Sequence, residues 1–389
     1  MPHGSVAVVF VALALLGCQR GRSAGASDGA PALAPEEISP PGVPAPPPPP
    51  PEPVGPPPPV VFAAGLIGAR APHDAADEIV PLRLEAGRVE VAPAIAAQHV
   101  AVDGDAFCVA SGAQVSLLRP FSKGQDARRA TVSCQARSLH LHGDRCFVGC
   151  SLRVDAVDFG PAVPLARTLH DDTHPEALAF KAEGRKRPVD FFLRTPARLW
   201  AVDDEERPKW VYLFDLREEA KFLARVSLPQ RTSRPVTGGA THGERIYLLE
   251  AFEHQAGSEN RITRLAFRDG RPTLARVAAE AQLRQRVPSS RNQRIIGDTF
   301  TAIAAMARVG DRLVLAARER GIILLGLDGA SPRLVATGGS CDHVVGVPGG
   351  VLALVDEKTL VELRWDAAAQ TLAQVARHPL PRPFGRLAR

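Results

Sequence analysis

The sequence predicts an all-β protein: a β-propeller of six or seven four-stranded blades, preceded by a signal peptide and a disordered, proline-rich tether. Three observations lead to this fold class. A short apolar segment near the beginning of the chain ends at a cysteine, a proline-rich stretch follows, and one strand–turn–strand pattern then recurs through the rest of the chain. The three parts are expected at residues 1–17, 18–60 and 61–389.

The first part has the properties of a secretion signal. Residues 6–16 are eleven consecutive apolar residues, which suits a signal-peptide core and is too short to cross a bilayer. The segment Leu15-Leu16-Gly17-Cys18 resembles the lipobox of bacterial lipoproteins. The resemblance implies cleavage after Gly17 and lipid on Cys18, and several acyl chains would make the membrane anchor stable. Unlike the usual signal peptide, residues 1–5 contain no Lys or Arg.

The second part is expected to be a spacer. Proline occupies most of the positions from Pro40 to Pro59. Such a run adopts polyproline II at about 3.1 Å per residue and would span roughly 60 Å. A ligand for SH3-like or WW-like domains is the alternative interpretation. Gln19 stands where an aspartate would signal retention in an inner membrane, so the lipid anchor is expected in the outer membrane.

The third part repeats itself from about residue 95 onward, which is the typical signature of a repeat architecture. Each copy is an apolar strand, a tight turn that usually contains glycine, and a second apolar strand. The intervals between successive copies vary in length. The five clear copies and a sixth, degenerate one (193–203) are VAVDGDAFCVA (100–110), LHLHGDRCFVG (139–149), LRTPARLWAVD (193–203), GATHGERIYLL (239–249), MARVGDRLVLA (306–316) and VGVPGGVLALV (345–355).

A third apolar strand follows every copy, and a fourth often follows that one. Four short strands in about 40 residues, joined by Gly-Asp turns, form the unit of a propeller blade. The hairpin-like segment 79–92 is expected to complete a seventh blade or to close the ring. The strands are not separated by helix-length amphipathic patterns, which argues against a parallel α/β fold. A β-sandwich is the alternative architecture.

The repeats resemble the LVIVD-type and WD-like propeller repeats of bacterial surface and periplasmic proteins, over residues 97–378. The shared motif is only apolar–Gly-Asp–apolar. A WD dipeptide occurs once, at Trp365-Asp366, and does not recur from repeat to repeat, and the tryptophan-docking motif of quinoprotein blades is absent. The resemblance therefore implies an architecture rather than an activity. The long segments 158–190 and 268–300 are expected as loops outside the blades, where a partner would bind. Their Arg and Lys clusters favour an acidic partner.

Five cysteines remain besides Cys18. Cys134 and Cys150 flank one predicted hairpin, and in an exported protein this pair is the predicted disulfide. The other three lie in apolar strands and are expected to be buried thiols; they are Cys108, Cys146 and Cys341.

Two groups of residues could bind a metal ion. His140 and His142 alternate on a predicted inner strand and so point to the same face, toward the channel of a propeller. Zinc sites usually take three or four protein ligands, so hydrogen-bonded histidines beside a turn are the alternative. The second group lies close together in a predicted loop and consists of His170, Asp171, Asp172 and His174. The alternative is a solvated loop that binds no metal.

Charge and motifs exclude several functional classes. The net charge is +5, and arginines alternate with acidic residues rather than forming one basic face, which argues against nucleic-acid binding. The GxSxG pattern occurs only at residues 21–29, in the predicted tether, where the strand-to-helix elbow of a hydrolase is not expected. The sequence contains no P-loop, HExxH or dinucleotide-binding fingerprint. It therefore names no cofactor.

The expected function is that of a lipid-anchored envelope protein whose propeller binds or scaffolds another envelope protein or polymer. The alternative is an enzyme that works in the propeller channel, of the lactonase or quinoprotein kind, with a metal or cofactor. Fold alone does not decide between them.

Overall fold

The computed structural model describes residues 60–65, 78–122, 127–184, 187–203, 209–228, 236–254, 257–268, 271–278 and 303–388. The chain divides into two compact units, residues 1–54 and 55–389, and everything described belongs to the second. The predicted signal peptide, the lipidation site at Cys18, the tether up to Pro59 and most of segment 268–300 lie outside the described residues.

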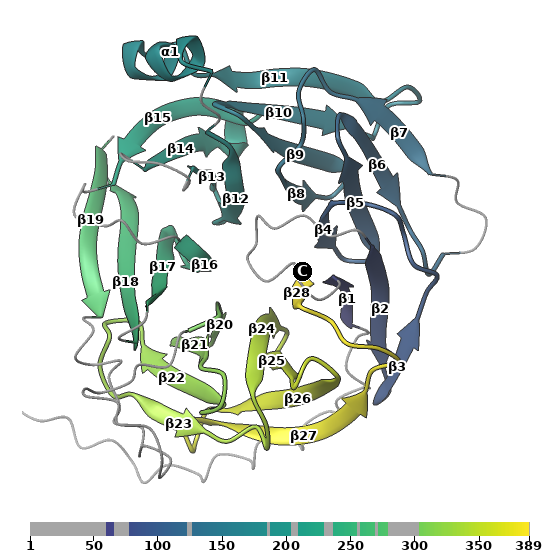
Figure 1. Ribbon diagram of the computed structural model, residues 1–389, viewed down its shortest axis with the longest axis vertical. Helices are drawn as coiled ribbons and strands as arrows, with labels where there is room; N and C mark the ends of the chain where they lie inside the picture. Colours follow the sequence, from purple (N-terminus) through teal and green to yellow (C-terminus); the bar gives the residue numbers. More distant parts are fainter. Residues whose placement is uncertain are drawn as a thin grey trace, which may run out of the picture. The chain divides into compact units, whose positions relative to one another are not determined.

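The second unit contains seven four-stranded antiparallel sheets arranged in a ring around a central axis (Figure 1). The prediction of a propeller is confirmed, with seven blades. Blades 1 to 3 are β4 (His99–Asp103), β5 (Ala106–Ser111), β6 (Gln114–Leu118) and β7 (Arg128–Thr131); β8 (Ser138–His142), β9 (Arg145–Cys150), β10 (Arg153–Asp158) and β11 (Leu165–Asp171); and β12 (Val189–Arg194), β13 (Arg198–Asp203), β14 (Trp210–Asp215) and β15 (Lys221–Ser227).

Blades 4 to 6 continue in the same order around the ring. They are β16 (Val236–His242), β17 (Arg245–His254), β18 (Gly257–Arg268) and β19 (Arg271–Ala278); β20 (Ala305–Val309), β21 (Arg312–Ala316), β22 (Ile322–Gly326) and β23 (Arg333–Val335); and β24 (Cys341–Val347), β25 (Gly350–Val355), β26 (Thr359–Asp366) and β27 (Thr371–Pro379).

Blade 7 closes the ring with strands from both ends of the unit. It consists of β28 (Arg386–Ala388), β1 (Val60–Gly65), β2 (Ile79–Glu85) and β3 (Arg88–Val91). The pairing of β28 with β1 is antiparallel and places Ala388 opposite Ala63. Segment 79–92 thus forms the two outer strands of a seventh blade, as the sequence predicted.

Tight turns join the innermost strand of most blades to the second strand. In blades 1 and 2 these turns contain Gly104 and Gly143, whose φ angles of 60° and 57° lie in the left-handed region. Glycine adopts this region without steric cost, and two-residue hairpin turns need it. The repeated glycine of the sequence pattern is therefore a requirement of the backbone at the turn.

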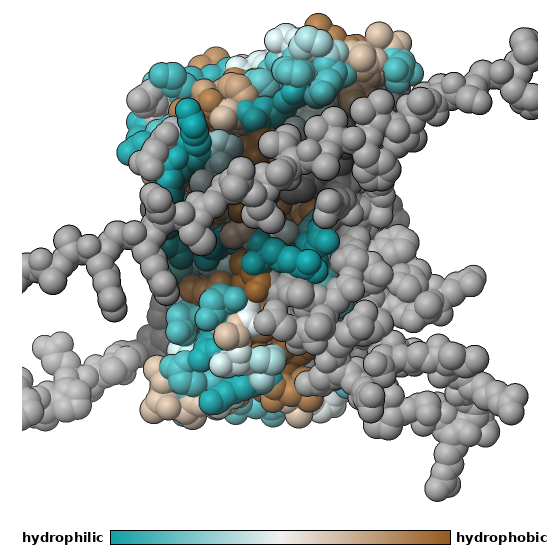
Figure 2. Space-filling model, turned by 90° about the vertical axis from the view of Figure 1, so that its left-hand side faces the viewer, coloured by the Kyte–Doolittle hydropathy of each residue, from teal (hydrophilic) through white to brown (hydrophobic). Residues whose placement is uncertain are grey.

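Burial decreases from the middle of each blade to its rim. Every residue of β14 and of β25 is buried, because both faces of these middle strands pack against neighbouring blades. The outermost strands alternate instead, as in β7, where exposed and half-buried residues follow one another. Hydrophilic and hydrophobic residues are correspondingly interspersed on the side of the ring that carries β19 (Figure 2).

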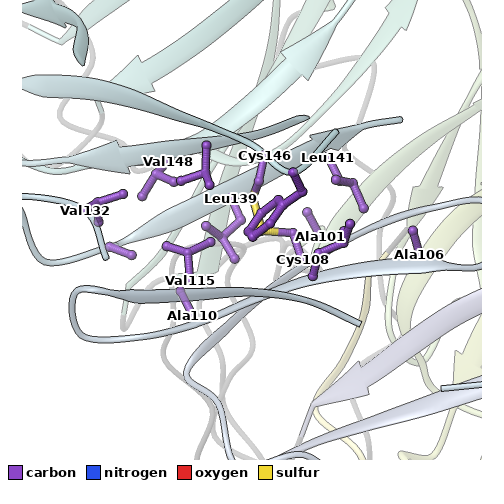
Figure 3. Close-up of a cluster of buried hydrophobic side chains, with 14 of the residues drawn as sticks. Ala101, Ala106, Cys108, Ala110, Val115, Val132, Leu139, Leu141, Cys146 and Val148 are labelled. Carbon is purple, nitrogen blue, oxygen red and sulfur yellow. A yellow bond between two sulfur atoms is a disulfide. The ribbon is translucent and has the colours of Figure 1, made fainter. Parts of the chain in front are cut away.

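Two disulfides lie in blades 1 and 2. One joins Cys134, between β7 and β8, to Cys150 at the end of β9, with a Cα–Cα distance of 6.1 Å. The other joins Cys108 of β5 to Cys146 of β9, with a Cα–Cα distance of 6.3 Å, inside the apolar cluster between the blades (Figure 3). The expectation of buried thiols at Cys108 and Cys146 is therefore wrong, whereas Cys341 is a buried free cysteine.

The repeat register explains the pairing of Cys108 with Cys146. When the copies 100–110 and 139–149 are aligned, Cys108 is equivalent to Phe147, the residue next to Cys146. Neighbouring residues of a strand point to opposite faces of the sheet. Cys108 therefore faces blade 2 while Cys146 faces blade 1, and the two sulfur atoms meet between the blades.

Segment 158–190 is not the loop that the sequence predicted. It contains β11 and the helix α1 (Pro175–Ala182), which begins with proline in its first turn and with His174 as N-cap. A short 3₁₀ helix, η1 (Leu216–Glu218), follows β14. No helix in the described part of the chain is long and apolar enough to cross a membrane.

Candidate functional site

The candidate site is a cavity of about 620 Å³ in the central channel. Residues from the innermost strands of all seven blades line it, namely from β4, β8, β12, β16, β20, β24 and β28. This volume is within the usual range for small-molecule sites, which also place a few polar groups among apolar ones.

Neighbouring inner strands lie at the same level along the channel. A side chain at Gly239 of β16 would come within 2.5 Å of Leu193 Cδ1 of β12, and these two residues start equivalent repeats. Likewise, a side chain at Gly346 of β24 would come within 3.2 Å of the carbonyl oxygen of Arg308 in β20. The strand beginnings therefore gather at one end of the channel and the hairpin turns at the other.

Four ionisable side chains lie at or near the strand beginnings. They line the cavity from four blades and are nearly buried, with exposed fractions of 4% for His99, 4% for Asp190, 9% for His343 and 5% for Arg386. His343 Nδ1 has no hydrogen-bond partner. Burial first, and then the charge of Arg386, lower the pKa of His343 from 6.5 to about 3, so the imidazole is neutral.

His140, in the middle of β8, lies against aromatic rings. Its ring centroid is 6.1 Å from that of Phe147 and 6.4 Å from that of Phe192 in the next blade. Its Nε2 atom is buried and has no hydrogen-bond partner. Burial and the nearby charge of Arg194 lower its pKa from 6.5 to about 4. His140 is thus a neutral residue of the channel wall.

His142, at the end of β8, has a different environment although it lies on the same face. It is exposed. Its Nε2 atom is 3.1 Å from Arg194 Nη2, and its Nδ1 atom is 3.7 Å from Asp103 Oδ2 of blade 1. These contacts link three consecutive blades at the turn end of the channel.

The structure does not bring the predicted metal ligands together as one site. Among the described residues, the only group of three or more potential ligand atoms within 4.8 Å of one another is Cys134, Cys150 and Asp155. There, the two sulfur atoms are bonded to each other. His140 and His142 therefore have no third ligand in the described part of the protein.

The run from His170 to His174 instead connects β11 to α1. His170 stacks on Phe222 at a ring distance of 3.9 Å, and Lys181 Nζ donates to Asp171 Oδ1 at 2.6 Å. His174 caps α1, its side chain accepting from Glu176 N. These residues are positioned by protein contacts rather than held in a solvated loop.

Asp172 is the central residue of this run and is only 3% exposed. Its Oδ2 atom accepts from Tyr212 Oη at 3.0 Å and from Arg225 Nη1 at 3.2 Å. Its Oδ1 atom accepts from the backbone N–H of His174 at 2.9 Å. Both oxygens of the carboxylate accept hydrogen bonds, and these bonds attach α1 to blade 3.

Sequence reasoning missed most of the cavity residues. It singled out His140 and His142 on an inner strand, but did not assign His99, Asp190 or Arg386 to the channel. Their common signal is a polar residue at the beginning of an otherwise apolar inner strand. Arg386 could not be recognised in this way, because β28 is a three-residue strand outside the repeat pattern.

Comparison with known proteins identifies only the fold. The sequence matches no known family profile and no curated protein. A protein from Lactobacillus plantarum is similar in structure, with a TM-score of 0.55 and 12% identity, over 84% of this chain and 98% of the other.

Two further solved structures are similar. Both proteins are provisionally named 6-phosphogluconolactonases. The one from Bacteroides uniformis has a TM-score of 0.51 and 12% identity, over 83% of this chain and 97% of its own. The one from Bacteroides fragilis has a TM-score of 0.50 and 13% identity, over 84% and 96%. At these identities the likeness concerns the fold alone, and the chain is a seven-bladed β-propeller.

Proposed function

We propose that this protein is a bacterial lipoprotein, anchored through Cys18 in the outer membrane, whose propeller binds another envelope protein or polymer. The observation that supports the binding role concerns the surface of segment 158–190. It places exposed apolar side chains on elements that are firmly attached to a blade.

The disulfides support export. Disulfides form and persist in oxidising compartments such as the bacterial periplasm and are rare in the cytosol. Cys108–Cys146 and Cys134–Cys150 both lie in blades 1 and 2. Together with the apolar segment 6–16 and the lipobox-like sequence ending at Cys18, they favour a location beyond the inner membrane.

The surface of segment 158–190 supports partner binding. Val163 is 78% exposed, Leu165 59% and Leu178 48%, and Leu223 on the neighbouring β15 is 36% exposed. Large exposed apolar side chains supply the kind of surface that protein contacts use. The scaffold below is fixed, because Arg225 Nη2 donates to Glu176 Oε2 of α1 at 3.3 Å in addition to its bond to Asp172.

One residue of the basic cluster expected in this segment is buried. Arg187, part of the expected basic cluster, has an exposed fraction of 0% and pairs with Asp203. It therefore cannot attract an acidic partner. The apolar residues, rather than a basic cluster, are the features through which we expect the partner to bind.

A photo-crosslinking amino acid at position 178 tests the binding role in cells of the native bacterium. Leu334 on β23 is the matched control position, because it is also apolar and 51% exposed. We expect one discrete covalent adduct from position 178 and none from position 334. Equal adduct patterns at the two positions would contradict the assignment of this surface.

The lipid anchor has a separate test. Replacing Cys18 with Ser should abolish labelling by a radioactive or clickable fatty acid and shift the protein from the membrane to the soluble fraction. Undiminished labelling of the Cys18→Ser variant would refute lipidation at this residue, and recovery in the inner-membrane fraction would refute outer-membrane sorting.

The channel enzyme of the lactonase or quinoprotein kind is the second candidate. The observation in its favour is the cavity, in which Asp190 and two histidines are buried near the strand beginnings. Metal analysis of the purified protein discriminates between the two candidates. A stoichiometric Ca²⁺ or Zn²⁺ ion, lost when Asp190 is replaced by Asn, would favour the enzyme.

A further inference from the structure

The channel cavity has an excess of positive side chains. Arg194, Arg308 and Arg386 line it, and Asp190 is the one carboxylate residue among the described residues of its lining. His140 and His343 are neutral and leave this excess of positive charge unchanged. Inside a cavity with protein walls, such an excess attracts anions more strongly than it would in open water.

The arginines come from three blades and from both ends of the channel. Arg194 is the last residue of β12 and Arg308 lies near the end of β20, at the turn end, whereas Arg386 begins β28 beside His343. One inner strand of five residues is about 13 Å long. A ligand between the two ends would therefore be larger than a single inorganic ion, consistent with the cavity volume of about 620 Å³.

The guanidinium groups at the turn end keep donors for a ligand. Arg194 Nη2 lies near His142, but the buried Arg194 Nε has no hydrogen-bond partner. Arg308 is exposed at the channel mouth, where its Nη1 donates to the carbonyl oxygen of Gly310 at 2.5 Å. Arginine presents several N–H donors in a fork that matches carboxylate and phosphate oxygens.

Buried nitrogens in the same wall also lack partners. His140 Nε2 and His343 Nδ1 make no hydrogen bond within the protein. A buried polar atom without a partner costs about 1–3 kcal/mol. These unpartnered nitrogens are an observation independent of the arginines, and a polar ligand that reaches them would offset part of this cost.

We propose that the channel cavity binds a small organic anion that carries carboxylate or phosphate groups. Arg194 and Arg308 bind one anionic end of the ligand, and Arg386 faces the other end. This site is separate from segment 158–190 on the rim of the ring. The test of the channel site requires no partner protein. The channel proposal can therefore fail while the proposed envelope function stands, and the envelope function can fail while the channel proposal stands.

Isothermal titration of the purified full-length protein tests the site. The probes are citrate, inorganic phosphate and, as a neutral molecule, glucose, each at low and high ionic strength. We expect citrate or phosphate to bind and glucose not to bind. Tighter binding of citrate would assign a carboxylate ligand, and tighter binding of phosphate would assign a phosphorylated one.

Charge-removing variants locate the binding. Arg194→Gln and Arg308→Gln should each lower the affinity for the anion by about tenfold or more, as expected for a lost charge-assisted hydrogen bond. Arg333→Gln on the outer strand β23 removes the same charge outside the cavity and should change the affinity less than about twofold. Because Arg308 is exposed, its replacement leaves the fold intact, which a thermal melt verifies.

Two results would overturn the proposal. One is the failure of both anions to bind at low ionic strength, where electrostatic attraction is strongest. The other is an equal loss of affinity in the Arg333→Gln and Arg308→Gln variants, because binding would then follow the net charge of the protein rather than the cavity.

Discussion

Burial determines the charge of the channel histidines. His343 is only 9% exposed and lies beside Arg386, so both desolvation and repulsion disfavour its protonated form. His140 experiences the same two effects, with Arg194 as the neighbouring positive charge and with Asp103 acting in the opposite direction. The same residues that would bind an anion thus keep the imidazoles neutral at physiological pH.

This arrangement predicts acid sensitivity. In the unfolded chain His343 has a pKa of 6.5, and in the folded protein the pKa is lowered to about 3. Its stabilising contribution is therefore fully present above pH 6.5 and is lost as the pH falls toward 3, because the unfolded state binds the proton first. The free energy of unfolding should decrease by up to about 1.4 kcal/mol per pH unit for such a histidine.

Urea unfolding at pH 7 and at about pH 5 measures this effect. The variant His343→Gln should lose less stability between the two pH values than the original protein does. Comparing the two pH values within each protein separates this effect from a uniform loss of stability caused by the substitution. An unchanged pH dependence in His343→Gln would show that this residue is not the source.

At the scale of single elements, α1 and the end of β11 act as a strap on blade 3. Arg187, which follows α1, has its guanidinium 3.8 Å from the Trp210 ring and 4.7 Å from the Phe180 ring of α1. Its Nε atom lies 3.1 Å from Asp203 Oδ2, and both side chains are 0% exposed. The cation joins the helix to the strands through stacking and through charge.

Removing this cation should be costly. Arg187→Met removes the positive charge that pairs with the buried Asp203 carboxylate. Breaking such a pair typically costs about 3–5 kcal/mol, so we expect a loss of that size. Arg167→Met is the matched control. Its partner Glu219 is 80% exposed and Arg167 itself 37%, and a surface pair of this kind contributes about 0–1 kcal/mol. Chemical denaturation of both variants is the measurement, and equal losses would refute the role of burial.

The repeat pattern predicted the strands but not what connects them. Gly-containing turns such as that at Gly143, and the alternation of the flanking strands, are local features that a sequence displays directly. The pairing of Cys108 with Cys146 and the burial of Arg187 depend on contacts between neighbouring blades, which local patterns do not reveal. Segment 158–190 was predicted to be a loop for the same reason. Helix α1 is short, and the contacts of Asp172, rather than a helical pattern in the sequence, fix its position.

At the scale of the whole ring, closure depends on the last strand of the chain. β28 pairs with β1, so blade 7 combines strands from opposite ends of the second compact unit. Leu387 is 3% exposed and packs in one cluster with Phe62 and Leu82. Closing the ring in this way covers the apolar faces that the first and last blades of an open ring would expose, and the radial arrangement leaves only short strand edges.

Deleting residues 386–389 should therefore open the ring. The deletion leaves the backbone of β1 unpaired on its inner side, uncovers the apolar cluster around Phe62 and removes Arg386 from the channel. We expect a lower midpoint of thermal unfolding and association of the variant in size-exclusion chromatography, because an unpaired strand edge recruits other chains. Deletion of residues 19–54, which belong to the other compact unit, is the control and should change neither quantity. If the two deletions behave alike, the stability of the propeller does not depend on closure by β28, and each pair of neighbouring blades must then be stable through its own interface.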